Sequence, residues 1–237
     1  MKRYFCGLLK LSGLKPAVLP GAVLLLGAVL FAAAPLSARA EAVPELVIKG
    51  DQVELRNPET AGGGLLDLND YVGDAICYRE DAAFILPCPG GWTGDPAAAG
   101  RLDLCGIYYP QAYTFDTAPV VMYPRLVTPF PGKSLEERAQ KQAEFTRDSF
   151  RKLPGGQNLT VRKEETYTAV NGRAFAIRFF DNGPPPNAAE AAAYTIHNDS
   201  MLIVVLSAKS AKDLKPYLPT LYTALDEVAA MNCVIEK

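Results

Sequence analysis

Residues 194–208, YTIHNDSMLIVVLSA, decide how this chain folds. The polar pair Asn198-Asp199 separates two runs of strand-forming residues, which predicts a β-hairpin with its turn at this pair. The run Leu202–Leu206 has no polar side chain on either face, and a strand of this kind is buried on both sides. The segment therefore predicts a central strand in a sheet that has other elements packed on both of its faces.

Further strands are predicted upstream of this hairpin. Asn171-Gly172 readily adopts the positive φ angles of a tight turn, so the flanking segments Asn158–Val170 and Arg173–Asp181 are predicted to pair as a second hairpin. Apolar residues bounded by turn-forming residues predict three more strands, which cover residues 83–88, 102–109 and 118–127.

Two helices are predicted. Ser134 and Glu137 have the spacing of a capping box, and apolar residues then repeat at helical intervals as far as Leu153, so one face of this helix packs on a core. A second apolar stripe at helical spacing, Leu214–Met231, predicts a last helix whose first turn is disturbed by two prolines.

The first forty residues are typical of a secretory signal peptide. Five basic and no acidic residues accompany an apolar stretch over residues 17–34, and Ala38-Arg39-Ala40 supplies small residues at Ala38 and Ala40. We therefore expect cleavage before Glu41 and a periplasmic or secreted mature protein. The alternative is a membrane anchor formed by residues 17–34, although that length is near the lower limit for spanning a bilayer.

The mature chain is predicted to be acidic and to form one main domain. The whole chain has a net charge of −2, and removal of the basic segment 1–40 makes the balance more negative. This argues against a nucleic-acid partner and against adhesion to an anionic membrane surface, so we expect membrane contact only through the signal segment before cleavage. Residues 41–82 are expected to be an irregular extension with short strands, followed by the main domain over residues 83–237.

Four cysteines remain after the expected cleavage, and four cysteines allow three pairings. Alternation of side chains along two neighbouring predicted strands favours a disulfide between Cys88 and Cys105, which leaves Cys77 to pair with Cys233. The alternative is four reduced thiols. A metal site is not favoured, since the sequence has no C-x-x-C pair and a single histidine.

The order of the predicted elements resembles the PsbP-like domains, a group that includes Ran-binding factors and bacterial envelope proteins of the DcrB type. The resemblance rests on these phrases and elements: Pro87–Trp92, Tyr108-Tyr109-Pro110, Ala118–Tyr123, the capped helix, the Asn171-Gly172 hairpin, Tyr194, Ile203–Ala208 and the final helix. It implies an α+β fold in which an antiparallel sheet of about six strands is sandwiched between helices. It also implies accessory or partner-binding work without catalysis or a cofactor.

Candidate recognition residues gather on and between neighbouring predicted strands. Tyr123 and Arg125 alternate with Val120 and Met122, so they point outward if the latter pair points into the core. Tyrosine, tryptophan and arginine are favoured at recognition surfaces. The candidate partner-binding residues are Trp92, Tyr109, Tyr113, Tyr123 and Arg125, and the alternative is that Trp92 and several of the others pack in the core.

Chemical motifs are weak by comparison. Gly132-Lys133-Ser134 lacks the first glycine of a phosphate-binding loop, because Val127 stands in its place. His197 is the only imidazole and lies beside the Asn198-Asp199 turn. The sequence therefore favours an exported, non-catalytic domain whose partner is another envelope protein. Two alternatives stay open: a hydrolase or transferase that uses His197 or carboxylates, and a binder of a small apolar ligand between sheet and helix.

Overall fold

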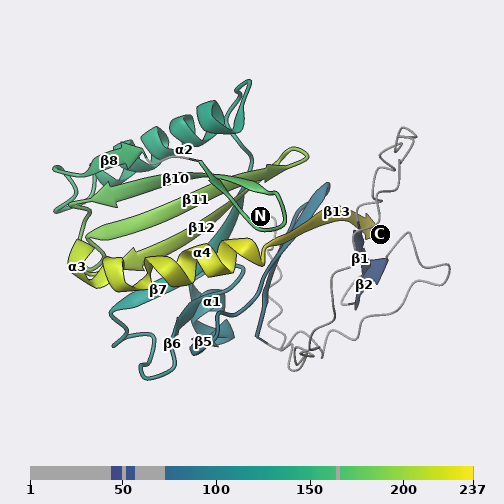
Figure 1. Cartoon of the computed structure of the whole chain (residues 1–237), viewed down its shortest axis with the longest axis horizontal. Helices are drawn as coiled ribbons and strands as arrows, with labels where there is room; N and C mark the ends of the chain where they lie inside the picture. Colours follow the sequence, from purple (N-terminus) through teal and green to yellow (C-terminus); the bar gives the residue numbers. More distant parts are fainter. Residues whose placement is uncertain (1–43, 50–51, 57–72, 164–165, 237) are drawn as a thin grey trace, which may run out of the picture.

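The computed structural model describes residues 44–49, 52–56, 73–163 and 166–236 (Figure 1). The expected signal segment, with Ala38, Ala40 and Glu41, lies outside these residues. The described chain contains two β-sheets, of five and eight strands, with helices packed on the larger one. The mixed α and β content is as expected, but the expectation of one sheet with about six strands is wrong.

The larger sheet is antiparallel throughout and has the strand order β5-β6-β7-β12-β11-β10-β8, with β9 paired to β10. Its strands are β5 (Trp92–Gly94), β6 (Tyr108–Pro110), β7 (Val120–Val127), β8 (Thr160–Lys163), β9 (Tyr167–Thr168), β10 (Ala174–Asp181), β11 (Ala189–His197) and β12 (Ser200–Ala208). Every residue of β12 is buried, and β12 lies between β7 and β11. The predicted central strand is thus confirmed, in a hairpin that is longer than predicted.

The hairpin at Asn171-Gly172 is also confirmed, although its central turn residues are Val170 and Asn171 and, of the pair, only Gly172 has a positive φ. Gly172 has a φ of 81°, and its N–H donates to the carbonyl of Ala169. The Asn171 side chain accepts from the N–H of Arg173 and donates to the carbonyl of Val228, which ties the turn to the end of the last helix.

The smaller sheet has the order β2-β1-β13-β4-β3, in which β1 and β13 are parallel and the other pairs are antiparallel. Its strands are β1 (Glu45–Lys49), β2 (Gln52–Arg56), β3 (Ala75–Tyr78), β4 (Ala82–Leu86) and β13 (Ala229–Glu236). The segment 41–82 therefore supplies β1, β2 and β3, and it pairs with both the start and the end of the segment 83–237.

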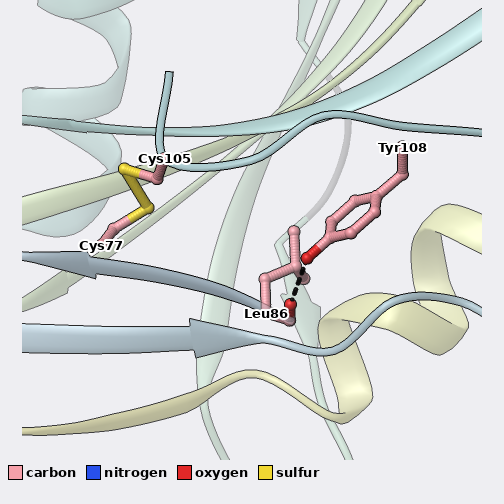
Figure 2. The surroundings of a disulfide bond; sticks show 4 residues. All are labelled: Cys77, Leu86, Cys105 and Tyr108. Carbon is pink, nitrogen blue, oxygen red and sulfur yellow. Dashed lines mark hydrogen bonds between the residues drawn. A yellow bond between two sulfur atoms is a disulfide. The ribbon is translucent and has the colours of Figure 1, made fainter. Parts of the chain in front are cut away.

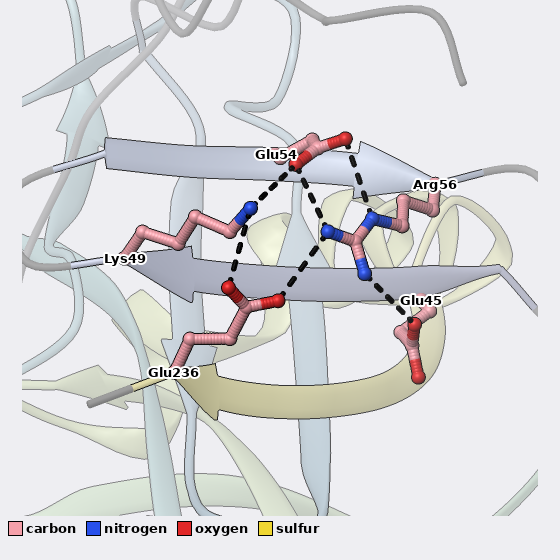
Figure 3. Close-up of polar contacts among 5 residues, drawn as sticks. All are labelled: Glu45, Lys49, Glu54, Arg56 and Glu236. Carbon is pink, nitrogen blue, oxygen red and sulfur yellow. Dashed lines mark hydrogen bonds and ion pairs between the residues drawn. The ribbon is translucent and has the colours of Figure 1, made fainter. Parts of the chain in front are cut away.

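Charged side chains cross the outer strands of the smaller sheet (Figure 3). Arg56 lies 3.3 Å from Glu54, 3.4 Å from Glu236 and 3.9 Å from Glu45, while Lys49 lies 3.2 Å from Glu236. All five are partly exposed, and solvent-exposed ion pairs contribute little to stability. The network is therefore best understood as the solvated face of these strands.

Two predicted elements are wrong. The expected strand over residues 102–109 is mostly a loop between helix α1 (Pro96–Leu102) and β6, which begins at Tyr108. Helix α1 precedes this loop because the Asp95 carboxylate caps it by accepting from the N–H of Ala98 at 2.8 Å and proline occupies the first turn. The last helix ends earlier than expected. Its parts are α3 (Ala211–Leu214), a 3-10 turn (Lys215–Tyr217) and α4 (Leu218–Asp226), after which Met231 and Cys233 point inward with the two-residue period of β13.

Both faces of the larger sheet are covered. One face packs against α4, β3 and β4 in the largest core cluster, and the other packs against α2 (Leu135–Phe150) and α1 (Figure 1). The predicted cap of α2 is confirmed, since the Ser134 hydroxyl accepts from the N–H of Glu137. The fully buried Arg178 of β10 pairs with Glu136 at 2.6 Å and so fixes α2 on the sheet.

The cysteine pairing differs from the expectation. Cys77 forms the disulfide with Cys105 at a Cα–Cα distance of 5.3 Å, so the predicted pairs Cys88–Cys105 and Cys77–Cys233 are wrong (Figure 2). Residues 96–102 form a helix, so Cys105 does not lie on a strand beside Cys88. Cys233 is a buried thiol in the small core between β13, β1 and β4.

Candidate binding groove

The groove has a floor that three neighbouring strands build in register. Tyr123 of β7 lies opposite Val205 of β12, which lies opposite Ala192 of β11. The next row on the same face runs from Arg125 across β12 to Tyr194. On this face, α2 packs against β8, β10 and β11, and α1 packs beside Val121 and Tyr123 of β7.

Two hollows adjoin on this floor. One, of about 470 Å³, lies under α2, and the other, of about 590 Å³, lies beside α1. Tyr123 and Arg125 line both hollows, so they form the boundary between them. We call the two hollows together the β7 groove. Volumes of this size are typical of sites for small molecules or for inserted side chains.

A buried carboxyl group lies in the floor of the β7 groove. Glu190 is 8% exposed and accepts a hydrogen bond from the hydroxyl of Ser207 at 2.9 Å. Burial raises the pKa of Glu190, while Ser207, Arg125 and Tyr123 oppose that shift. The folded protein therefore favours the protonated carboxyl more than an exposed glutamate would.

Arg125 is the cationic group of the hollow under α2. Its side chain is exposed, and no described residue forms a salt bridge with it. It lies near enough to Glu190, Tyr123 and Tyr194 to influence their pKa values. Burial raises the pKa of both tyrosines, so their hydroxyls stay protonated and act as neutral hydrogen-bonding groups.

Aromatic rings form the wall of the hollow under α2. Phe130 and Phe145 lie 5.5 Å apart between ring centroids, and Phe150 and Phe180 line the deeper part. Phe145 is 58% exposed although it belongs to this wall. Phe145 therefore offers an accessible aromatic ring to a ligand in the hollow.

The expected recognition residues do not form one surface. Trp92 is buried on the opposite side of the sheet, where it packs edge-on against Tyr217. Tyr109 is buried and its hydroxyl donates to Asp95, whereas Tyr113 is exposed. Of the five, Tyr123 and Arg125 line the β7 groove.

The orientation of Tyr123 and Arg125 agrees in part with the expectation. Val120 and Met122 point into the largest core cluster, and Tyr123 and Arg125 point to the opposite face. Arg125 is exposed, but Tyr123 is only half-exposed because α1 and α2 cover that face as well.

His197 has a structural environment in this fold. Its Nε2 lies 3.2 Å from the Asn232 amide oxygen, and its ring packs edge-on against Phe84. Burial lowers the pKa of His197, and the contact with Asn232 opposes that shift. Within the described residues, no group of three or more His, Cys, Asp or Glu side chains could hold a metal ion, and no helix is long and apolar enough to span a membrane.

Sequence reasoning missed Glu190 and the aromatic wall. Glu190 is the only acidic residue between Asp181 and Asp199, in a run rich in alanine, and that isolation was a usable signal. Its position beside Ser207 and Arg125 depends on the register of three strands, which the sequence does not reveal. Phe145 could have been noticed as an apolar residue off the buried stripe of α2.

Known proteins offer a distant structural likeness to this chain and no match in sequence. No protein-family model and no curated protein sequence matches this chain. The structure is similar to the solution structure of cyanobacterial PsbP (CyanoP) from Synechocystis sp. PCC 6803, with a TM-score of 0.36 and 11% identity. That match covers 72% of this chain and 98% of the other. The likeness is distant, and the function proposed below is supported by the groove itself.

Proposed function

We propose that this chain is an exported, non-catalytic accessory domain of the PsbP-like kind that binds another envelope protein through the β7 groove. The observation that supports binding is the meeting of two hollows at Tyr123 and Arg125 on a face that the helices leave partly open. Tyrosine and arginine beside exposed aromatic rings are the residue types enriched where proteins recognise partners.

Export is supported by the disulfide and by the residues at the start of the sequence. Disulfides persist in oxidising compartments such as the periplasm and the extracellular space. The signal-peptide pattern over residues 1–40, with small residues before Glu41, agrees with that compartment. A periplasmic or secreted protein with a net acidic mature chain is also a poor ligand for nucleic acid.

Binding is favoured over catalysis because of what surrounds the titratable groups. The contacts of His197 with Asn232 and Phe84 connect the β11–β12 turn to the smaller sheet, which is a structural role. Glu190 is buried and held by Ser207, and no histidine is among the described residues that line either hollow.

The test is partner capture from an envelope extract with a groove variant and a matched surface variant. Arg125→Gln with Phe145→Ala removes the cation and one exposed ring of the groove. Arg101→Gln with Val170→Ala changes the same kinds of exposed side chain outside it. We expect the groove variant to lose capture by about tenfold or more and the surface variant to keep it. Equal capture of the partner by both folded variants would mean that the binding surface lies outside the β7 groove.

A further inference from the structure

We infer that the hollow under α2 accepts an amphipathic acid: an apolar, preferably aromatic, body that ends in a single carboxylate. This inference rests on the proposed function, because it specifies the chemistry that the β7 groove recognises. It names the chemical class of ligand that the part of the groove under α2 accepts.

The shape and lining of the hollow specify the apolar body. Its volume of about 470 Å³ suits a molecule of one or two rings. Phe130, Phe145, Phe150 and Phe180 provide edges and faces for stacking, and aromatic pairs gain energy beyond their buried area. Ala192 on the floor has a small side chain, so the volume between these rings is not filled from below.

The charges of the hollow specify the carboxylate. Among the described residues that line it, Arg125 and Glu190 are the charged ones. Glu190 is buried and bonded to Ser207, and it does not form an ion pair with Arg125. Arg125 is exposed and forms no salt bridge with a described residue, and a guanidinium binds a carboxylate through two parallel hydrogen bonds.

Neutral groups next to Arg125 complete the recognition of an anion. The hydroxyls of Tyr123 and Tyr194 stay protonated and can donate hydrogen bonds. An ammonium ligand would instead meet the exposed guanidinium of Arg125, and like charges repel. The hollow therefore discriminates in favour of acids over amines.

The experiment compares three probes that share one ring system: naphthylacetate, naphthylethanol and naphthylethylamine. Isothermal titration calorimetry on the mature protein measures each affinity. We expect naphthylacetate to bind about tenfold or more tightly than the alcohol and the amine to bind most weakly, as one charge-assisted contact would give. Equal affinities for the three probes, a preference for the amine, or no binding at all would overturn the inference.

Variants locate the site. Arg125→Gln should remove the preference for naphthylacetate over naphthylethanol. Phe145→Ala should weaken the binding of both compounds. The control Arg101→Gln should leave both affinities unchanged. A preference for the acid that survives Arg125→Gln in a folded protein would overturn the assignment. A peptide with an apolar residue and a free C-terminal carboxylate that competes better than naphthylacetate would assign the hollow to the protein partner instead of a free acid. If capture of the partner depends on Arg125 and Phe145 while the acid does not bind, the inference fails and the proposed function stands.

Discussion

Glu190 and Ser207 lie directly opposite each other on β11 and β12, and the hydroxyl of Ser207 donates to the Glu190 carboxyl at 2.9 Å. This pair places a titratable group in the floor of the β7 groove, where little water reaches it. Arg125 and Tyr123 from β7 and Tyr194 from β11 are the other titratable or charged groups that interact with it. The protonation of Glu190 therefore links the stability of the fold to the chemistry of the groove.

Glu190→Gln should stabilise the protein at neutral pH. Because burial raises the pKa of Glu190 above its ordinary value of 4.5, the unfolded chain loses this proton at lower pH than the folded protein does. The wild type thus loses stability as pH rises from about 4.5 until the folded carboxyl also ionises. Glu190→Gln has no carboxyl at this position, so its stability does not show this loss. Urea unfolding at about four pH values between roughly pH 4 and pH 8 measures the difference in the free energy of unfolding between the wild type and the variant.

The control for this prediction is Glu227→Gln, at an exposed position beyond α4. It should leave the pH dependence of unfolding unchanged. A stability difference between wild type and Glu190→Gln that shrinks as pH rises would contradict the account of Glu190.

Removal of the disulfide should lower stability by about 3 kcal/mol, the size expected for a cross-link that closes a loop of this length. Cys77→Ala with Cys105→Ala is the variant, and Cys88→Ala is the matched control because Cys88 lies outside the bond. Peptide mapping without reduction should recover one cross-linked pair that contains Cys77 and Cys105. Recovery of a Cys88–Cys105 peptide instead would show that the bond is misassigned.

Asp81→Ala should loosen the contact between the two sheets. The Asp81 carboxylate accepts from the N–H of Asp199 at 2.8 Å and from the hydroxyl of Ser200 at 3.0 Å, and Ser200 is fully buried. Loss of the carboxylate leaves that hydroxyl without this acceptor, which costs about 1–3 kcal/mol. Thermal unfolding should show the loss, whereas Asp116→Ala at an exposed position should not.

Hydrogen exchange distinguishes this local effect from a general one. Amides of the β11–β12 turn and of β4 should lose protection together in Asp81→Ala. Protection that falls evenly over the whole larger sheet would mean that Asp81 does not act at this contact.

Local sequence signals predicted the elements whose cause is local. The apolar run Leu202–Leu206, the Asn171-Gly172 turn and the Ser134 cap each determine their own structure within a few residues, and all three predictions are confirmed. The strand β13 was missed because Val228 and Met231 continue the helical spacing of α4, and only pairing with β1 and β4 makes the segment a strand.

The groove was harder to predict than the fold. Arg125 and Tyr123 were found because they alternate with core residues on one strand. Glu190 was missed because it reaches them only through the register of β7, β12 and β11. The disulfide was mispredicted because Cys105 lies in the loop between α1 and β6, where a strand was expected.

Site-specific photo-cross-linking tests most directly whether the β7 groove is the binding surface. A benzophenone side chain replaces Arg125 in one protein and Thr223, an exposed residue of α4 on the other side of the sheet, in a second. Irradiation in the intact envelope, followed by mass spectrometry, identifies what each position touches. The account predicts a discrete cross-linked partner from position 125 and none from position 223. Cross-links of equal yield from both positions, or a partner captured from position 223 alone, would contradict it.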